Sequence, residues 1–418
     1  MQRRVISNKE ENMPATATPI LQQAWAHFQQ TLDEVRLELE ATPRFQHLPL
    51  QRAKAYHVLM EVQAMAYNYV VAPRMLHPRL NLHTCLQTDV FTLAQNCQDF
   101  FYQMSYLDGR QRYRISGRMG DLSLILLQTF NGMWGESGVS ETGNYDWADF
   151  SIDARGRFEV ILSASCEEGN WIPIDPQVGY QMILIRSALV DWHGDRGELR
   201  IDRISEIPDD HYDADEFDEA AMATRIRRAA DFVRFLIKFG IIGLYDNYLR
   251  NANHQKNVLA LLPGAAVGTG ASPSCNYAYG IFDLQDDEAL IMEMDKIPDG
   301  AYWSFQLGEV WSRSLDFSSR QSSLNMGEIV VDGDGGFRVV IAHRDPGISN
   351  WLDPCGRREG TIVFRNYSAA SAPVPSSRKV KFADLAIVLP ADTRRITPAE
   401  RKHAMERRLL GQRILYGD

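Results

Sequence analysis

The sequence predicts an α+β fold, mainly β, with two related β-units and helices at the N-terminus, in the middle and at the C-terminus. Three observations lead to this prediction. Two regions, 108–206 and 279–372, contain short runs in which apolar and polar residues alternate, the period of a half-buried strand. These two regions resemble each other, which indicates an internal duplication. Elsewhere apolar residues recur at three- and four-residue steps, as they do in amphipathic helices.

The composition is that of a globular chain with more than one core. At 418 residues, with 45% hydrophobic and 23% charged residues, two or three cores are expected. The net charge of -10 argues against a nucleic-acid partner, and no apolar run approaches the roughly 20 residues of a membrane helix. The five cysteines are widely spaced without a Cys-x-x-Cys pair, so we expect neither disulfides nor zinc, and a cytoplasmic location.

The N-terminal part, 19–107, is expected to be helical. It follows a polar leader, 1–18, which has no apolar run behind its basic residues and so does not resemble a secretory signal; Met13 is an alternative start to Met1. Thr18 and Pro19 form an N-cap and first-turn pair. We expect three helices, beginning near Pro19, over about Leu50–Tyr69 and near Phe91–Phe101, and we assign them to packing or to a homo-oligomer interface.

The first β-unit, 108–206, has its clearest strands in IDARGRFEVIL and NWIPIDPQVGYQMILIR. The following stretch, 207–278, combines an acidic linker, a long and mostly apolar helix through about Tyr248, and a Gly-rich loop, LLPGAAVGTGASPSCN. That loop lacks the strand, helix and lysine context of a phosphate-binding loop. The polar end of the long helix, YDNYLRNANHQKN, could face a pocket, although an exposed helix end is the simpler interpretation.

The second β-unit, 279–372, is followed by the C-terminal part, 373–418. This part begins with a Pro/Ser linker, APVPSSRK, continues as a strand-like run, KFADLAIVLP, and ends in a helix. Thr397 and Glu400 have the spacing of a capping box at the start of that helix.

The duplication aligns FSIDARGRFEVIL with IVVDGDGGFRVVI, and GNWIPIDPQVGYQMILIR with SNWLDPCGRREGTIVFR, about 180 residues apart. Residues kept in both copies are expected to serve the fold, through a hairpin turn, core aromatics and a loop tied by an asparagine side chain. The matched pairs are Asp153 and Asp332, Phe158 and Phe337, Asn170 and Asn350, Trp171 and Trp351, and Arg186 and Arg365.

The second copy differs from the first in its polar residues, so we expect the functional site there. His343, Arg344 and Asp345 stand where the first copy has Ala164, Ser165 and Cys166, and Asp353 stands where it has Pro173. In the strand YWSFQL, alternation places Tyr302, Ser304 and Gln306 on one face and Trp303, Phe305 and Leu307 on the other, whereas the matching DLSLILL is almost wholly apolar.

These residues suggest acid–base chemistry. His343, oriented by Asp345 or Asp353, could transfer protons while Tyr302 donates to a developing oxyanion. The alternative is structural: Arg344 and Asp345 would anchor the loop before Asn350, with His343 at a strand end. Expected substrate-binding residues are Trp303, Gln306, Trp311, Arg320, Asn325, Arg344, Asn350 and Trp351. No metal constellation, nucleophile elbow, Walker loop or dinucleotide fingerprint is present, so no metal or organic cofactor is expected.

Several of these segments also carry a family resemblance. YWSFQLGEVWSRSLDFSSRQSSLN, AHRDPGISNWLDPCGRREG, GNWIPIDP with RSALVDW, and LPADTRRITPAER together resemble the bacterial domain of unknown function 1214 family, from Trp25 to Arg408. The resemblance implies β-sandwich, jelly-roll-like folding of the repeated units. It implies no reaction, and it marks Tyr302, Trp303, Gln306, Asn350, Trp351 and Asp353 as characteristic rather than catalytic.

Two kinds of function remain open at this stage. The first is an enzyme of small-molecule metabolism that acts by acid–base chemistry on a largely apolar substrate, such as a terpenoid, lipid or polyketide, in a pocket of the second β-unit. The alternative is a non-catalytic β-sandwich that binds glycan or lipid against exposed Trp and Tyr side chains, or a structural assembly protein.

Overall fold

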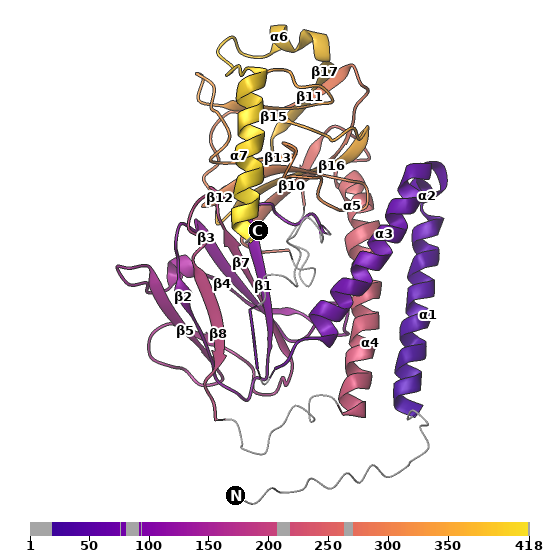
Figure 1. Cartoon of the computed structure of the whole chain (residues 1–418), viewed down its shortest axis with the longest axis vertical. Coiled ribbons are helices and arrows are strands. Elements are labelled where there is room, and N and C mark those ends of the chain that lie inside the picture. Colours follow the sequence, from indigo (N-terminus) through magenta and orange to yellow (C-terminus); the bar gives the residue numbers. More distant parts are fainter. Residues whose placement is uncertain are drawn as a thin grey trace, which may run out of the picture.

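A computed structural model describes residues 19–75, 77–80, 92, 94–206, 218–262 and 271–416 of the chain. It confirms the predicted fold class: two β-sandwich units, with helices at the N-terminus, in the middle and at the C-terminus (Figure 1). The leader 1–18, most of the acidic linker and half of the Gly-rich loop lie outside the described residues.

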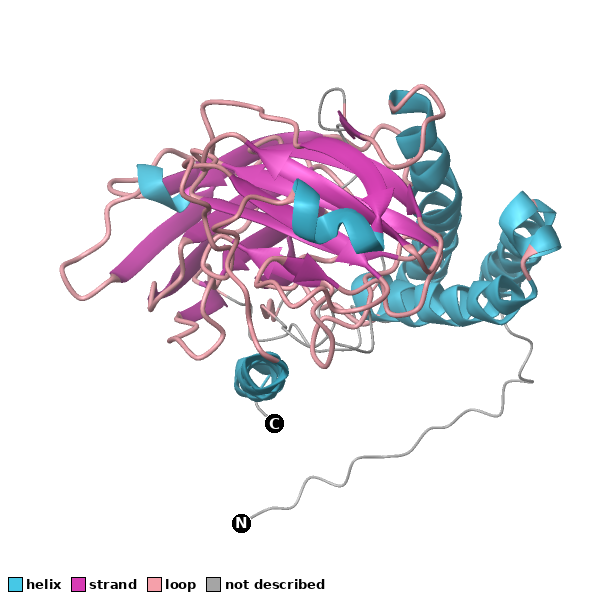
Figure 2. Cartoon of the chain, turned by 90° about the horizontal axis from the view of Figure 1, so that it is seen from above, coloured by secondary structure: helices cyan, strands magenta, loops and turns pink. Residues whose placement is uncertain are grey.

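The helical layer stands beside both β-units (Figures 1 and 2). Its N-terminal elements are α1 (Pro19–Ala41), α2 (Pro43–His47), α3 (Pro49–Ala66) and the π-helical turn η1 (Tyr67–Val71). The long central helix packs against α1 and consists of α4 (Glu219–Phe235), the π-helical segment η4 (Leu236–Gly243) and α5 (Leu244–Asn251). The first two predicted helices and the long helix are confirmed; the π-helical segments were not predicted.

The predicted third helix is wrong in the described part of its range. Residues 94–99 form turns, and Phe100 starts strand β1 (Phe100–Leu107). The run FFYQMSYL is completely buried because one face packs in the sandwich core and the other against the central core. A strand buried on both faces loses its alternation, so its period could not be read from the sequence.

The two β-units share one topology, which supports the duplication. In the first unit the inner sheet has the order β1-β7-β3-β4 and the outer sheet β6-β5-β2-β8; in the second, β13-β12-β16-β10-β9 and β15-β14-β11-β17. Adding nine to each strand number of the first unit gives the order of the second, apart from the extra edge strand β9. The first-unit strands are β2 (Tyr113–Arg118), β3 (Leu124–Phe130), β4 (Glu141–Asp146), β5 (Arg157–Ser163), β6 (Trp171–Pro173), β7 (Gln181–Ala188) and β8 (Glu198–Arg203).

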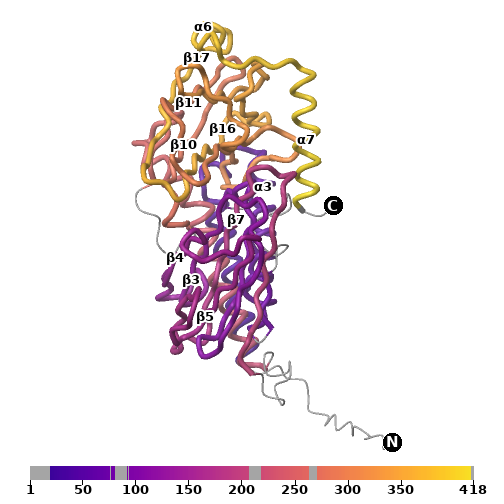
Figure 3. Tube along the Cα trace, turned by 90° about the vertical axis from the view of Figure 1, so that its left-hand side faces the viewer, coloured from indigo at the N-terminus to yellow at the C-terminus, as the bar shows by residue number. Residues whose placement is uncertain are grey.

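The second unit repeats this arrangement above the first (Figure 3). Its strands are β9 (Leu259–Leu261), β10 (Cys275–Asp283), β11 (Glu288–Met294), β12 (Tyr302–Gly308), β13 (Ser323–Asn325), β14 (Phe337–Ala342), β15 (Trp351–Leu352), β16 (Glu359–Tyr367) and β17 (Ser376–Lys381). Each sandwich has its own core between inner and outer sheet, and a third, central core joins the other faces of both inner sheets to the helices.

The matched asparagines tie equivalent loops, as the sequence predicted. Asn170 exchanges side-chain hydrogen bonds with the backbone of Ser151, and Asn350 does the same with Val330. Asp153 and Asp332 each close a turn with the glycine three residues later. Both pairs therefore hold the same connection in each copy.

The C-terminal part differs from the prediction in one element. KFADLAIVLP was expected to be a strand, but it contains the 3-10 turn η5 (Phe382–Asp384) and the short helix α6 (Leu385–Val388), while the strand β17 lies in the predicted linker. Leu385 and Leu389 cover the outer face of the second outer sheet, and helical spacing lets both reach it. The terminal helix α7 (Pro398–Tyr416) begins with the predicted capping box, in which Glu400 N donates to Thr397 Oγ1 (3.2 Å) and Thr397 N to Glu400 Oε2 (2.7 Å).

Candidate functional site

A cavity of about 340 Å³ lies where the two inner sheets meet the helical layer. Strands β1 and β7 of the first unit, β10 and β16 of the second, and helices α3, α4 and α5 all contribute to its wall. Its volume is in the range of small-molecule sites. It lies in the central core, outside both sandwiches.

Most of the cavity wall is apolar. The lining side chains include Trp134, Leu184, Phe232, Phe235, Leu236 and Phe239. A larger hollow of about 840 Å³ lies over β2 and β8. Besides a few buried side chains such as Phe101 and Phe158, it is lined by charged side chains at the surface, some of which pair with each other, such as Arg118 with Asp195. The smaller, apolar cavity is therefore the better candidate for a ligand site.

Two arginines at matched positions bring charge to the same cavity. Arg186 lies opposite Tyr102 in the first inner sheet, and Arg365 lies opposite Tyr277 in the second. Each guanidinium donates Nη1 to a glutamine on the neighbouring strand: Arg186 to Gln128, and Arg365 to Gln306 at 2.7 Å. The duplication has thus placed the same Arg–Gln–Tyr set on two sides of one cavity.

Tyrosines surround these arginines. Tyr102, Tyr277, Tyr279 and Tyr367 line the cavity, and the Tyr277 and Tyr367 hydroxyls lie 3.0 Å apart. Burial raises the pKa of Tyr102 to about 12 and also raises the pKa values of the other three phenols. All four are therefore neutral hydrogen-bonding groups at neutral pH and supply no negative charge to the arginines.

Both π-helical segments touch the cavity. Tyr69 comes from η1, and Leu236, Phe239 and Gly240 come from η4. π-Helical segments are rare and are frequent at functional sites, because the wider turn shifts side chains and leaves carbonyl groups without helical partners. Here Arg44 of α2 donates Nη2 to the carbonyl oxygens of Ile241 and Ile242, at 3.2 Å each.

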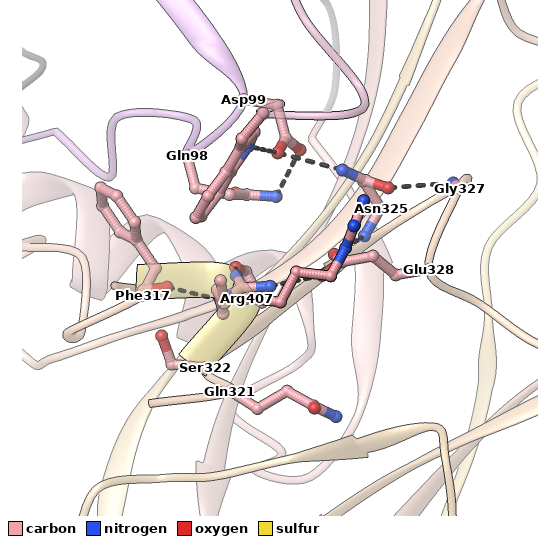
Figure 4. Close-up of polar contacts among 12 residues, drawn as sticks. Gln98, Asp99, Phe317, Gln321, Ser322, Asn325, Gly327, Glu328 and Arg407 are labelled. Carbon is pink, nitrogen blue, oxygen red and sulfur yellow. Dashed lines mark hydrogen bonds and ion pairs between the residues drawn. The ribbon is translucent and has the colours of Figure 1, made fainter. Parts of the chain in front are cut away.

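A second polar cluster ties the two units together beside the cavity. The Asp99 carboxylate is fully buried and accepts hydrogen bonds from Gln98 Nε2 (2.7 Å) and Asn325 Nδ2 (3.0 Å) (Figure 4). It also accepts hydrogen bonds from Trp192 Nε1 (2.7 Å) and Tyr302 Oη. Burial, and then the charge of Glu328, raise the pKa of Asp99 to about 7. Because donors satisfy this carboxylate on all sides, we assign it a structural role.

The predicted catalytic residues contact different partners. His343 follows the end of β14 and its Nε2 is 3.1 Å from Leu284 O, whereas Asp345 accepts hydrogen bonds from Gly347 N (2.8 Å) and Arg401 Nε (2.9 Å). The Asp345 contacts are those of the structural alternative, since they fix the loop. Asp353 is buried and paired with Arg320 at 2.5 Å.

Tyr302 is also fully buried, with its hydroxyl bonded to Asp99 and 3.1 Å from Cys97 Sγ. None of His343, Asp345, Asp353 and Tyr302 lines the central cavity. Their catalytic roles stay predictions.

The predicted aromatic contacts are buried. Trp303 is 3% exposed and stacks on Phe337, and Trp311 is 0% exposed and lies 4.6 Å beneath the Arg44 guanidinium. Neither ring offers a platform, so the glycan version of the binding alternative loses its basis. Trp351 donates its Nε1 to Ala342 O, and Arg344 lies over the ring of Phe382.

Some of the remaining predicted residues make structural contacts, and one of them supports a residue of the cavity wall. The alternation in YWSFQL is confirmed: Trp303, Phe305 and Leu307 lie in the second sandwich core, and Tyr302 lies in the central core. Gln306 does not line the cavity, but its side chain accepts a hydrogen bond from Arg365, which does. Asn325 donates to Asp99, and Asn350 donates to the backbone of its loop.

The polar end of the long helix has one side on the cavity. Asn247 and Asn251 line it, whereas Asp246, Arg250 and His254 are exposed. The two asparagines therefore face a pocket, as one interpretation of this sequence expected, while the other three residues form an exposed helix end, as the alternative expected.

Sequence reasoning did not select Arg186 and Arg365 as site residues, because residues kept in both copies were assigned to the fold. The available signal was an arginine inside an otherwise apolar strand, QMILIRSA and TIVFRNY. A charge in a strand buried on both faces requires a specific partner.

Among the described residues, no group of three or more His, Cys, Asp or Glu side chains is placed to hold a metal ion. No helix of this part is long and apolar enough to cross a membrane. The expected homo-oligomer, the absence of a nucleic-acid partner and the cytoplasmic location stay predictions.

Residues 283–371 match the family described as Protein of unknown function (DUF1214). The resemblance drawn from the sequence is thereby confirmed for this part of the second β-unit. No curated protein matches the chain significantly.

Solved structures extend the likeness beyond the DUF1214 domain. An uncharacterized protein from Burkholderia cenocepacia is 29% identical, with a TM-score of 0.76, over 88% of this chain and all of that one. The VPA0106 protein from Vibrio parahaemolyticus covers the same shares at 13% identity and a TM-score of 0.44, too distant to support an argument. The first match indicates that this chain and that protein share one architecture over most of their length.

Proposed function

We propose that the protein binds a largely apolar small molecule in the central cavity. The supporting observation is the cavity itself: apolar rings from the two β-units and the helices enclose one space, framed by two π-helical segments. A largely apolar molecule in this space would make packing contacts with the apolar side chains that line it.

This proposal concerns binding and assigns no reaction. The acid–base residues expected from the sequence are engaged in loop and inter-unit contacts away from the cavity. Binding of a lipid-like molecule is the part of the sequence-based alternative that the geometry supports.

The test uses a neutral apolar dye, N-phenyl-1-naphthylamine, whose fluorescence rises in an apolar site. We expect saturable binding to the wild type, and at least roughly tenfold weaker binding to Leu184→Trp, because the indole fills space that the ligand needs. Leu184 lines the cavity and is 1% exposed.

The matched control is Leu410→Trp, the same change at a residue of α7 that is 53% exposed. This control should bind the dye as the wild type does, and unfolding temperatures establish that both variants fold. Absence of saturable binding in the wild type, or equal binding by both variants, would reject the proposal. Native mass spectrometry of the wild type provides an independent search for a retained molecule.

A further inference from the structure

We infer that the ligand is an organic acid, and that its carboxylate binds to Arg365 while its apolar part occupies the rest of the central cavity. This inference rests on the proposed binding function and adds the chemical class of the ligand. It is carried by the hydrogen-bonding groups of the wall.

Arg365 is a buried cation without a protein anion. Its side chain is 3% exposed, and among the described residues no carboxylate lies within the 4.0 Å of an ion pair. Its two hydrogen bonds go to uncharged oxygens, Gln306 Oε1 at 2.7 Å and Gln95 O. A buried charge is costly unless an opposite charge or several hydrogen bonds compensate it. The planar guanidinium has further N–H groups, and a carboxylate is the partner that such a fork accepts best.

The matched arginine provides an internal comparison. Gln128, which binds Arg186, also donates its Nε2 to the Glu141 carboxylate at 2.6 Å. The Arg–Gln pair of the first unit is thus linked to a protein carboxylate. Gln306 of the second unit donates instead to Asn96 O and Ser314 Oγ, both uncharged. One copy carries its own anion, and the other has none within hydrogen-bonding reach among the residues that the structure describes.

Two further donors of the wall have no acceptor within the described part of the chain. Asn96 Nδ2 and Trp134 Nε1 are buried and make no hydrogen bond to a described residue, and both residues line the cavity. Asn96 is 2% exposed and follows Gln95, whose carbonyl oxygen binds Arg365. Buried donors in native proteins are nearly always paired, so these two predict acceptor atoms on the ligand. The two donors and the Arg365 guanidinium therefore both indicate a ligand that carries hydrogen-bond acceptors and a negative charge.

The experiment compares two probes of equal chain length, dodecanoate and 1-dodecanol, as competitors of N-phenyl-1-naphthylamine at neutral pH. In the wild type we expect dodecanoate to displace the dye at a concentration roughly ten- to a hundredfold lower than the alcohol, the effect of a charge-assisted hydrogen bond. In Arg365→Met, which keeps the length of the side chain without its charge, the two probes should compete equally.

A second variant guards against misfolding of the first. Asn96→Asp preserves the shape of the side chain and places a carboxylate in the wall, so it should remove the preference for dodecanoate while the neutral dye still binds. Equal competition by both probes in the wild type would overturn the inference and leave the binding function intact. Failure of the wild type to bind the dye would instead reject the binding function itself. Retention of the full preference in both variants would show that the carboxylate binds elsewhere.

Discussion

The Asp99 carboxyl group connects segments that are far apart in the sequence, and its titration should make the stability of the fold depend on pH. Burial raises its pKa from the ordinary value of 3.8 to about 7. Between these two values the unfolded chain holds fewer protons at this site than the folded one. The free energy of unfolding should therefore fall as pH rises from about 4 to 7, by up to about 1.4 kcal/mol per pH unit, and the Asp99 contribution should be constant above 7.

Urea unfolding at several pH values between 4.5 and 7.5 measures this effect, with Asp99→Asn as the reference that cannot titrate. The variant should be less stable overall by about 1–3 kcal/mol, since the amide cannot accept from all four donors. Subtracting its profile from that of the wild type should leave the predicted slope. Tyr302→Phe should extend the slope to higher pH, because the Tyr302 hydrogen bond lowers the pKa of Asp99. Parallel profiles for wild type and Asp99→Asn would show that Asp99 is ionised in both states.

At the scale of single elements, helix α7 connects the two units through a few buried contacts. Arg401 binds Asp345 and Ile348 O in the second unit, while Arg408 donates to Phe317 O at 2.5 Å and lies over the ring of Trp192 from the first unit. Figure 1 shows the helix running along both units. Arg401 and Arg408 of this arginine-rich helix are therefore structural anchors.

Arg408→Ala should lower the free energy of unfolding by about 2–4 kcal/mol, because it leaves the Phe317 carbonyl and the Ser323 hydroxyl without their donor and removes the partner of Glu328. Its neighbour Arg407 is the matched control. That side chain is 58% exposed and pairs only with exposed Asp191 at 3.5 Å, so Arg407→Ala should change stability by less than about 0.5 kcal/mol. Chemical denaturation of the two variants measures both changes in the free energy of unfolding. Similar decreases for both variants would mean that α7 acts through its general charge rather than through Arg408.

The elements also show what the sequence could and could not reveal. Strong periodicity or a specific cap located α1, α3, α7 and most strands, and the repeat located the two units. Strand β1 was missed because it is buried on both faces, and α6 because four residues show no helical period. The π-helical geometry of η4 depends on tertiary partners such as Arg44, which no local pattern contains.

For the candidate site, the sequence correctly placed a polar face on β12, but the residues of that face do not line the cavity; they contact residues that do. Gln306 holds Arg365, and the groups that reach the cavity come from positions shared by both copies. Arg186 and Arg365 are identical in the two copies, so differences between the copies do not point to them. The cavity forms only where two inner sheets and a helix meet, and this packing is not encoded in any single segment.

At the scale of the whole molecule, duplication placed two similar sheets around one central core, and the proposed ligand site belongs to neither unit alone. A ligand in this cavity should therefore stabilise all three parts together, since it contacts β7, β16 and the η4 segment at once. Hydrogen exchange followed by mass spectrometry tests this with dodecanoate at saturation. Exchange should slow in peptides from the η4 segment and from 94–99, two of the wall segments that lie outside the sheets, and the slowing should reach peptides of both β-units.

Leu184→Trp serves as the control for this experiment, since it keeps the fold and fills the cavity, and dodecanoate should leave its exchange unchanged. The location of the protected peptides distinguishes a site in the second sandwich core from a site in the central cavity. A ligand held in the second sandwich core, near the charged residues that the sequence emphasised, would slow exchange in β14 and β15 and leave the helices unaffected. Protection restricted to those strands would place the site inside the DUF1214 domain, whereas joint protection of η4 and both inner sheets requires the cavity at their junction.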